Sequence, residues 1–584
     1  MTRHYPGLCQ KIADWFRVHD ENHPQKEYKA PSWVLLVAVS LLTWATIGVW
    51  PIVPTEGDDA AIAAGAALIR EGGSPRHPLL YRYDVQPATY WVTAIISRGL
   101  WLPAIQALGV LTIVSTFALI VLSAQWSAQA TRISFSVALL ITLLCQEAST
   151  TAYFGNSTVP AAALGTLGLV LLQAGTTSRR LKNHHHSVKA GWDTKVVPLL
   201  LAGLCFGIAT LFRWDVVLLG PGALWLLWTR SKSSPSYIVA CLGSWFAILL
   251  VGAWGLEVSV ADVIGEGKAH LEHFGQWKQS LICWASWWSL PLFALTIVGL
   301  RELVVQKQKN ELFLFVFGFV PSAIVYGWNL TTPKYLLYTL PFVVRVACFG
   351  IRELLAGDPP RHRRFLLGGL TLVVLQYPFG PLSLASWLTG KNFTVAGTHD
   401  GPRRLDALWA SPWMWQRMKK ATSHADREAI TLLSGILQNT PQLVILTDDW
   451  FSSSWINLQL LEWGYLPVEV YRHFDSIPIR KHHDVHVLRK GLQSSQRPEF
   501  IAHFEIDWLE REYPTAAWSN IWSRYKEGTP TILLISGRWN SLSVLQRWLS
   551  QLPGLPKAEV RPAVVGPGRP WVFLLQFRTT SSSP

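Results

Sequence analysis

Charged residues are scarce in this sequence. Only 15% of its 584 residues are Asp, Glu, Lys or Arg, whereas about a quarter is usual in a soluble globular domain. Hydrophobic residues make up 50% of the chain, and 31 residues are Trp. This composition excludes an ordinary soluble globule and predicts a protein that crosses a membrane several times.

Cysteine motifs and a cleavable leader are also lacking. The six Cys residues show no CxxC or Cys/His spacing, so neither a disulfide framework nor a zinc site is predicted. Residues 1–32 are polar and mixed in charge, and they contain no short apolar core followed by a small-residue cleavage site. We therefore expect residues 1–32 to form a cytoplasmic N-terminal segment.

Long apolar runs follow one another between residues 33 and 385. About eleven are long enough to cross about 30 Å of hydrocarbon. They lie near 33–53, 99–124, 134–153, 158–176, 197–213, 216–229, 236–256, 283–300, 312–328, 336–352 and 365–385. Arg213 and Asp215 interrupt the run 197–229. We interpret that run as a hairpin of two spans; a single bent helix is the alternative and would reverse every later span.

The charge of the loops predicts the orientation. The basic loops all fall on the side of the N-terminus, and they are 177–196, 229–233, 301–310 and 352–364. The alternate loops are acidic or nearly neutral. Because Lys and Arg concentrate in short cytoplasmic loops, we expect the N-terminus in the cytoplasm of a plasma (inner) membrane. An odd number of spans then places the C-terminus outside.

Residues 386–584 differ in character from the preceding part. They contain no run long enough to cross a membrane, and apolar strand-like runs precede helix-like segments, as in PQLVILTDDW (441–450) and TPTILLISGRW (529–539). We expect a soluble extracytoplasmic α/β domain here. The expected fold is therefore mainly α, with a polytopic transmembrane domain over 33–385 and this second domain.

The loop 54–98 contains an acidic pair. Asp58 and Asp59 follow the first apolar run and precede an Ala-rich segment that is expected to be helical to about Arg70. Both acids could simply cap that helix and complement its dipole. Alternatively, one carboxylate acts as a general base on an acceptor hydroxyl, or holds a divalent cation beside a phosphate. A divalent cation is the only cofactor suggested.

Three stretches in order resemble membrane glycosyltransferases of the GT-C type, particularly the protein O-mannosyltransferases and the lipid A aminoarabinose transferases. The first is the acidic pair with YRYDVQPATYWV (81–92), which is similar to the family's YFEKPPLLYWL and places Asp84 on its Glu. The second is GLCFGIATLFRWDVVLLGPGALWLL (203–227), and the third is TTPKYLLYTLPFVV (331–344). The resemblance covers roughly residues 33–385 and leaves the C-terminal domain unmatched.

The resemblance implies a transfer reaction. A sugar would pass from a polyprenyl-phosphate donor to an acceptor glycan, lipid or protein on the outer face, with inversion and with Asp58 or Asp59 as the catalytic carboxylate. Val85 stands where the family has a phosphate-contacting Lys, so Arg82 is expected to substitute for it. The residues expected to bind substrate are Arg82, Tyr83, Asp84, Lys334, Tyr335 and Arg213.

Other interpretations remain open at this level. Lys334 and Arg213 could be basic side chains that only reach the membrane interface, and Arg213 could only pair with Asp215. The alternative function is a transporter or flippase of a lipid-linked or sugar substrate, although mid-span charges are few and no repeat is evident. A membrane-anchored binding protein would leave the acidic pair unexplained. Membrane lipid is an expected partner and nucleic acid is not.

The loop 257–282 has an amphipathic pattern. It is expected to be an interfacial helix with an aromatic anchor, or a cover over the site that contacts sugar through Trp277. A metal site through His270 and His273 would need further ligands that the sequence does not identify.

Overall fold

A computed structural model of the whole chain describes the backbone of a defined set of residues. They are 32–47, 57–73, 80, 83–145, 156–177, 196–230, 235–271, 290–329, 337–355, 368, 394–398, 401–404, 433–436, 442–447, 450–463, 469–471, 500–505, 531–536, 558–564 and 571–577. The expected N-terminal segment, except Ser32, and the last expected span, except Gly368, lie outside these ranges.

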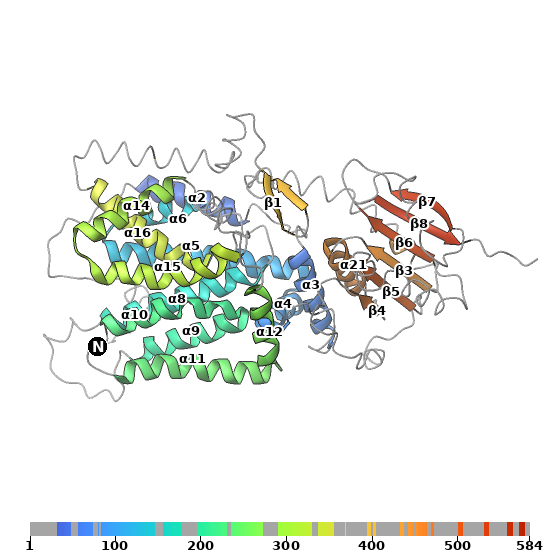
Figure 1. Cartoon of the computed structure of the whole chain (residues 1–584), viewed down its shortest axis with the longest axis horizontal. Coiled ribbons are helices and arrows are strands. Elements are labelled where there is room, and N and C mark those ends of the chain that lie inside the picture. The colour runs from blue at the N-terminus through green and yellow to red at the C-terminus, as the bar shows by residue number, and fades with distance from the viewer. Residues whose placement is uncertain are drawn as a thin grey trace, which may run out of the picture.

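Helices make up the first part of the described chain. They are α2 (Ser32–Ile47), α3 (Gly57–Arg70), η1 (Tyr83–Val85), α4 (Pro87–Leu100), α5 (Ala104–Thr131), α6 (Phe135–Leu143), α8 (Thr158–Thr177), α9 (Val196–Phe212), η4 (Trp214–Leu219), α10 (Gly220–Arg230), α11 (Pro235–Gly255), α12 (Val260–Leu271), α14 (Leu290–Val305), α15 (Lys309–Asn329) and α16 (Leu340–Leu355). Figure 1 shows most of them side by side as a bundle, with α3, α4 and α12 at the end that faces the C-terminal sheet.

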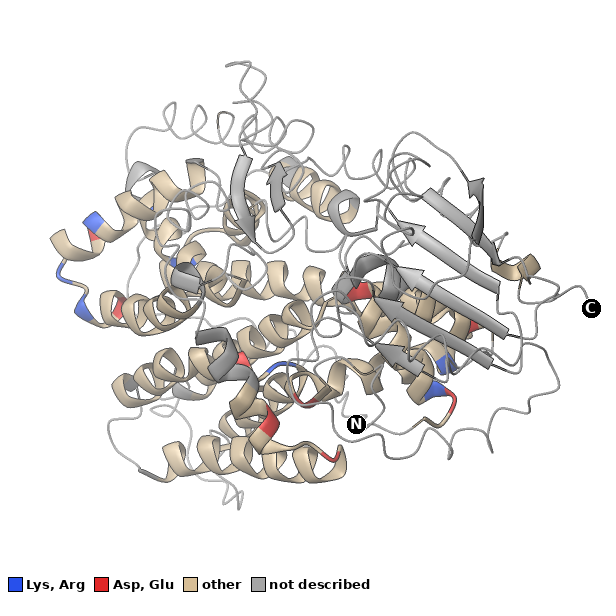
Figure 2. Cartoon of the chain, turned by 45° about the vertical axis from the view of Figure 1, so that its right-hand side comes forward, with Lys and Arg blue, Asp and Glu red and all other residues tan. Residues whose placement is uncertain are grey.

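The bundle helices are apolar along most of their length. No Lys, Arg, Asp or Glu occurs in α5, α8, α9 or α11. In the described part of the chain, the stretches long and apolar enough to cross a membrane are Ala104–Thr131, Thr158–Gly175 and Ser236–Gly255. Figure 2 shows the described charged residues mainly toward helix ends. Large apolar side chains of α11 such as Phe246 and Leu250 are exposed, as expected where a helix faces lipid.

The boundary of the second expected span is corrected by the structure. The sequence suggested a span from residue 99, but α4 continues to Leu100 and ends at Trp101, whose backbone is left-handed (φ 55°). Pro103 then precedes α5, which begins at Ala104. The apolar run was continuous through this turn, so hydrophobicity alone did not separate the two helices.

The run 197–229 folds as two helices. The backbone of Arg213 is extended (φ −164°, ψ 123°) between α9 and η4. The start of α9 packs against the end of α8. Trp225 in α10 donates to the carbonyl of Asn310 at the start of α15 (3.0 Å). Arg345 bonds both the end of α8 and the start of α15, so these two helix ends lie together. The start of α9 and the end of α10 therefore lie at that same end of the bundle. These contacts agree with a hairpin that turns at Arg213.

A buried polar cluster holds that end of the bundle. Arg345 of α16 is only 2% exposed. Its guanidinium donates to both carboxylate oxygens of Glu311 (2.8 and 2.9 Å) and to Gln173 (2.8 Å), and it lies 4.3 Å from the ring centroid of Trp126. A buried charge needs this degree of pairing. The cluster therefore joins α16, α15, α8 and α5.

Helix α3 forms where the sequence predicted a helix, and it is enclosed on its sides. Apart from Gly65, every residue from Asp59 to Leu68 is at most 2% exposed. At Gly65, a Cβ atom would lie 2.5 Å from Cε1 of Tyr90, which is itself fully buried. Small side chains thus allow α4 and α5 to approach α3 closely.

The C-terminal region contains a mixed sheet and a helix. The strands are β1 (Thr394–Thr398), β2 (Gly401–Arg404), β3 (Gln442–Thr447), β4 (Glu469–Tyr471), β5 (Phe500–Glu505), β6 (Thr531–Ser536), β7 (Ala558–Val564) and β8 (Trp571–Phe577). β1 and β2 form a separate pair, and the other strands are ordered β4-β5-β3-β6-β8-β7. β3, β4, β5 and β6 are parallel, while β8 is antiparallel to β6 and β7. The helix expected after β6 lies outside the described residues.

Helix α21 (Trp450–Glu462) connects this sheet to the bundle. It follows β3 directly and contacts β3, β5 and α3. Leu458 and Leu461, three residues apart and so on one helix face, are buried in the same apolar cluster as Ile62, Ala66 and Ile69 of α3. Figure 1 shows α21 between the sheet and α3.

Candidate functional site

The acidic pair lies in the first turn of α3. This helix begins at Gly57, so Asp58 and Asp59 are inside it and not before it. A carboxylate there still interacts favourably with the helix dipole. Asp59 is fully buried and has an interaction partner. The side chain of Asp58 is outside the part of the chain that the structure describes. Helix capping and catalysis are therefore both consistent with the position of the pair.

Helix η1 fastens the turn between α11 and α12. The hydroxyl of Tyr83 accepts a hydrogen bond from Nε1 of Trp91 (2.7 Å) and donates to the carbonyl of Leu256 (2.8 Å). Oδ1 of Asp84 accepts a hydrogen bond from the backbone N–H of Ser259 (2.6 Å). Two adjacent residues of η1 therefore hold a turn more than 170 residues later in the chain.

The fastened turn has an unfavourable backbone at one position. Glu257 is left-handed (φ 54°), a conformation that costs a non-Gly residue about 1 kcal/mol or more. Ser259 directly precedes α12, and its hydroxyl accepts a hydrogen bond from the N–H of Asp262 (3.4 Å) in the first turn of that helix. The bonds from Tyr83 and Asp84 thus help to maintain a turn that its own backbone does not favour.

The start of α4 is joined to the end of α9. Thr89 is fully buried and its hydroxyl donates to the carbonyl of Phe212 (3.2 Å). The ring of Tyr90 lies 5.8 Å from that of Tyr83 and also packs against Gly65 of α3. The structure therefore brings α3, η1, α4 and the turn after α9 together at one end of the bundle.

Arg213 occupies the turn after α9 and is buried, with 8% of its surface exposed. Its Nε donates to Oδ2 of Asp215 (2.7 Å), and a terminal nitrogen donates to the hydroxyl of Ser157 (3.1 Å). Asn156 beside it accepts from the N–H of Val159 and so caps α8. Reaching out to the interface is therefore the wrong interpretation for Arg213, and pairing with Asp215 is observed.

The other expected site residues fall outside the described part of the chain. They are Arg82, Lys334 and Tyr335. The side chain of His270 and the whole of His273 also lie outside it. Among the described residues, no group of three or more His, Cys, Asp or Glu is placed to hold a metal ion.

Several contacts at this end of the bundle were not predicted from the sequence. Ser259, Ser157 and Thr89 have no distinguishing sequence pattern, because each is identified only by a partner far along the chain. Asn156 could have been found, since Asn before an apolar run is a helix-start signal.

Comparison with known proteins identifies the fold of the chain. No family model matches the chain, and no curated protein sequence matches it at a significant level. The crystal structure of ArnT from Cupriavidus metallidurans bound to undecaprenyl phosphate superposes with a TM-score of 0.58 at 14% identity, covering 94% of this chain and 98% of ArnT. The apo structure of that ArnT gives a TM-score of 0.52 at 14% identity, with 93% and 98% covered. AglB, an oligosaccharyltransferase from Archaeoglobus fulgidus, gives 0.47 at 11% identity, covering 86% and 69%.

The two ArnT structures show that this chain has the fold of ArnT. This confirms at the level of fold the resemblance seen in the sequence. The likeness also extends beyond it, because 94% coverage includes most of the C-terminal region that the sequence motifs did not match.

We predict that Asp84→Ala releases the turn at Ser259. A hydrogen bond to a charged acceptor contributes about 1.5–3 kcal/mol, so hydrogen exchange of the Ser259 amide should become about tenfold faster or more. Exchange would be measured by mass spectrometry on peptides covering 256–271 in lipid nanodiscs. Glu257→Gln, a change of an exposed acid in the same turn, is the matched control. Equal exchange in Asp84→Ala and wild type would show that Asp84 does not hold the turn.

Proposed function

We propose that this chain is an integral-membrane glycosyltransferase that moves a sugar from a polyprenyl-phosphate donor to an acceptor on the outer face of the membrane. The observation that carries the proposal is that α3, which begins with the acidic pair, packs against α4, whose Thr89 bonds the carbonyl of Phe212 just before the Arg213 turn, in a bundle with the fold of ArnT. ArnT has been crystallised with undecaprenyl phosphate bound, which supports a donor of this class. The acceptor would be a glycan, a lipid or a protein.

The chemistry proposed is a single displacement. The acceptor hydroxyl oxygen attacks the anomeric carbon, the bond from that carbon to the phosphate oxygen breaks, and polyprenyl phosphate leaves. The hydroxyl proton passes to a carboxylate of the acidic pair, which acts as general base. One displacement inverts the anomeric configuration, so NMR of the product should show the configuration opposite to that of the donor. Retention would exclude this mechanism.

The charge distribution supports the proposed orientation. At the end of the bundle away from α3, the described basic residues outnumber the acidic ones, and they are Arg132, Arg230, Arg301, Lys307, Lys309, Arg345 and Arg352. Near α3, η1 and α12, acids predominate, and they are Asp58, Asp59, Glu71, Asp84, Asp215, Glu257 and Asp262. Since basic residues favour the cytoplasmic side, this distribution supports an acidic end that faces outside. The sheet beside α3 would then be an extracytoplasmic α/β domain, with about eleven spans between the termini.

Reporter fusions test this orientation. A reporter that is active only outside the cytoplasm should be active when fused after Pro584, because the sheet lies at the acidic end. The same reporter inserted near His185 in the basic loop 177–196 should be silent. A silent C-terminal fusion would place the sheet in the cytoplasm and remove the proposed site from the outer face.

Of the two acids, Asp58 is the better candidate for the general base. Asp59 is fully buried and already has a partner, whereas a general base must come within hydrogen-bonding distance of the acceptor hydroxyl. Neighbouring residues on a helix point about 100° apart, so the burial of Asp59 does not determine the surroundings of its neighbour. Asp59 would then hold the start of α3.

Substitution of each acid separates the two roles. Asp58→Asn keeps the size but removes the base, so transfer should fall about a hundredfold to ten-thousandfold while the protein still accumulates and inserts. Asp59→Asn should lower thermal stability more than Asp58→Asn does. Transfer would be measured by mass spectrometry of lipid-linked sugars and envelope glycans in cells with each variant, with and without the wild-type protein as references. Near-normal transfer in both variants would leave capping as the function of the pair.

The donor phosphate requires positive charge at the outer face. Arg82 is the first candidate because Val85 replaces the Lys of the resembled family, and Lys334 with Tyr335 is the second. Arg213 is a third candidate, since it lies buried beside the start of α8, where helix N–H groups also favour an anion. Tyr83 and Asp84 would act beside them by holding the adjacent turn.

Binding of undecaprenyl phosphate to the purified protein tests these cations. Arg82→Gln and Lys334→Gln should each weaken binding by roughly tenfold, since each removes one charged contact of about 1.5 kcal/mol or more. Arg82→Lys should recover part of the loss unless a two-pronged contact is needed. Arg98→Gln, an exposed arginine in the last turn of α4, serves as the control. Unchanged binding in both Gln variants would leave Arg213 or a divalent cation on the acidic pair as the phosphate contact.

A transporter or flippase is the alternative, and one observation bears on it. Transporters place ionisable groups inside the membrane, and Arg345 with Glu311 is such a buried pair. The pair lies at the end of the bundle away from the acidic pair, however, and its partners are satisfied within the bundle. A transporter would also keep moving its substrate in Asp58→Asn, so the same variant distinguishes the two functions.

A further inference from the structure

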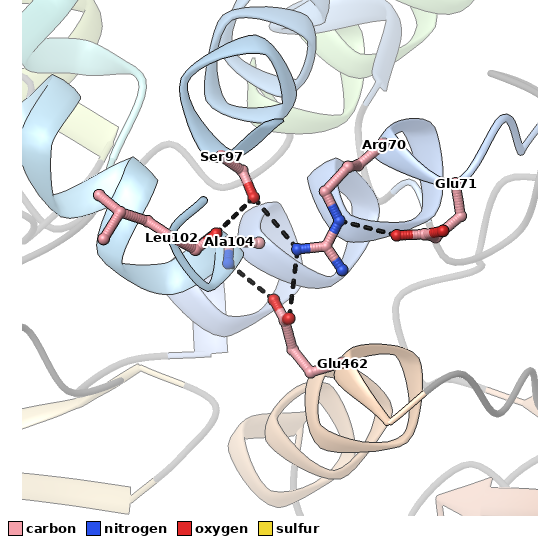
Figure 3. A network of polar contacts seen from close by, with 6 residues as sticks. All are labelled: Arg70, Glu71, Ser97, Leu102, Ala104 and Glu462. Atoms are coloured by element: carbon pink, nitrogen blue, oxygen red, sulfur yellow. Dashed lines mark hydrogen bonds and ion pairs between the residues drawn. The ribbon is translucent and has the colours of Figure 1, made fainter. Parts of the chain in front are cut away.

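Glu462 is the last residue of α21, the helix that follows β3 in the C-terminal region, and it reaches the bundle with both carboxylate oxygens. Oε2 pairs with a terminal nitrogen of Arg70 (3.2 Å), and Oε1 accepts a hydrogen bond from the backbone N–H of Ala104 (2.6 Å). Figure 3 shows the carboxylate between these two partners. One side chain therefore contacts the last residue of α3 and the first residue of α5.

Arg70 extends the contact to α4. The nitrogen that pairs with Glu462 also donates to the hydroxyl of Ser97 (3.1 Å), and that hydroxyl donates to the carbonyl of Leu102 (2.6 Å). Nε of Arg70 donates to the more exposed Glu71 (2.8 Å). The ends of α3 and α4 and the start of α5 thus meet at one carboxylate of the C-terminal region (Figure 3).

The partners of Glu462 suit a carboxylate at this position. The side chains of Arg70 and Glu462 are 18% and 19% exposed, so water screens their attraction only in part. Ala104 is at the start of α5, where backbone N–H groups have no partner in their own helix and the dipole favours negative charge. Burial lowers the pKa of Arg70, but the charges of Glu462 and Glu71 outweigh that effect and raise the pKa overall.

We propose that Glu462 is a positioning residue through which the C-terminal region sets α3, and with it Asp58 and Asp59, against α4 and α5. This inference rests on the function proposed above. Helix α3 has 14 residues and is roughly 21 Å long, so Glu462 acts through the helix as a rigid body and does not touch substrate. Since Leu458 and Leu461 pack on the same helix, the C-terminal region is part of the catalytic unit.

The geometry distinguishes the two carboxylates that pair with Arg70. Glu71 is 43% exposed, adjacent in sequence and on the same segment, so its loss leaves the packing between α3 and α21 intact. Glu462 comes from another part of the fold and has a second bond to α5. Glu71→Gln is therefore a control that removes a partner of the same arginine without breaking the link between regions.

Hydrogen exchange of α3 in the full-length protein in nanodiscs tests the link without any ligand. Peptides covering 57–73 should exchange about tenfold faster in Glu462→Gln and in Arg70→Gln. Exchange in the double variant should equal that in either single variant, because both substitutions remove the same ion pair between Arg70 and Glu462. Arg70→Lys should recover part of the protection, and Glu71→Gln should change exchange less than about twofold. Equal exchange in Glu462→Gln and wild type would overturn the proposal.

Turnover tests the consequence for the site. With the polyprenyl-phosphate-sugar fraction extracted from host membranes as donor, kcat should fall about tenfold in Glu462→Gln, with little change in donor KM, because the phosphate contacts lie elsewhere. Faster exchange with wild-type kcat would show that Glu462 holds α3 without positioning the acids, and would also overturn the proposal. If the wild-type protein itself transfers no sugar, the proposed function fails, while the exchange measurements still decide whether Glu462 links the two regions.

Discussion

Close packing around α3 is the constraint on which the end of the bundle beside the C-terminal sheet depends. The helix consists largely of Ala, and its residues from Asp59 to Leu68, except Gly65, are at most 2% exposed. Side chains this small make few long-range contacts, so the position of the helix is set by the surfaces of α4, α5 and α21 that pack directly against it. Any displacement of these neighbours also displaces the acidic turn at its start.

Paired charges mark the places where distant elements must meet. Arg345 with Glu311 joins helices at the basic end of the bundle, and Arg213 with Asp215 fixes the turn after α9. Glu462 with Arg70 joins the sheet region to α3. Such pairs add little net stability compared with an apolar contact, but loss of Glu311 would leave the buried Arg345 unpaired, which costs roughly 3–5 kcal/mol. The partly exposed pair of Arg70 and Glu462 is screened by water and its loss costs less. They therefore favour one arrangement of the helices over its alternatives.

Under the proposed function, a lipid-linked donor would present its headgroup beside the acidic turn. The helices expose apolar side chains along their length, while the polar contacts of η1, α12 and the Arg213 turn gather at one end. A polyprenyl tail would lie in lipid against the bundle, and its phosphate would stay at the polar end. An enzyme at this boundary needs few charged residues, provided that they are held in place, and this agrees with the low charge content of the chain.

The sequence alone determined the membrane class, the helix that ends at Arg70, the break at Arg213 and the strands at 442–447 and 531–536. These features follow from local composition and periodicity, since each residue's preference for water or lipid is its own property. Only the tertiary structure decided that Asp84 bonds Ser259, 175 residues away, and that Glu462 reaches Arg70, 392 residues away. Nothing local distinguishes those carboxylates from other acids of the chain. Their partners are set by which helices pack together, and that depends on the shapes of surfaces that exist only after the chain has folded.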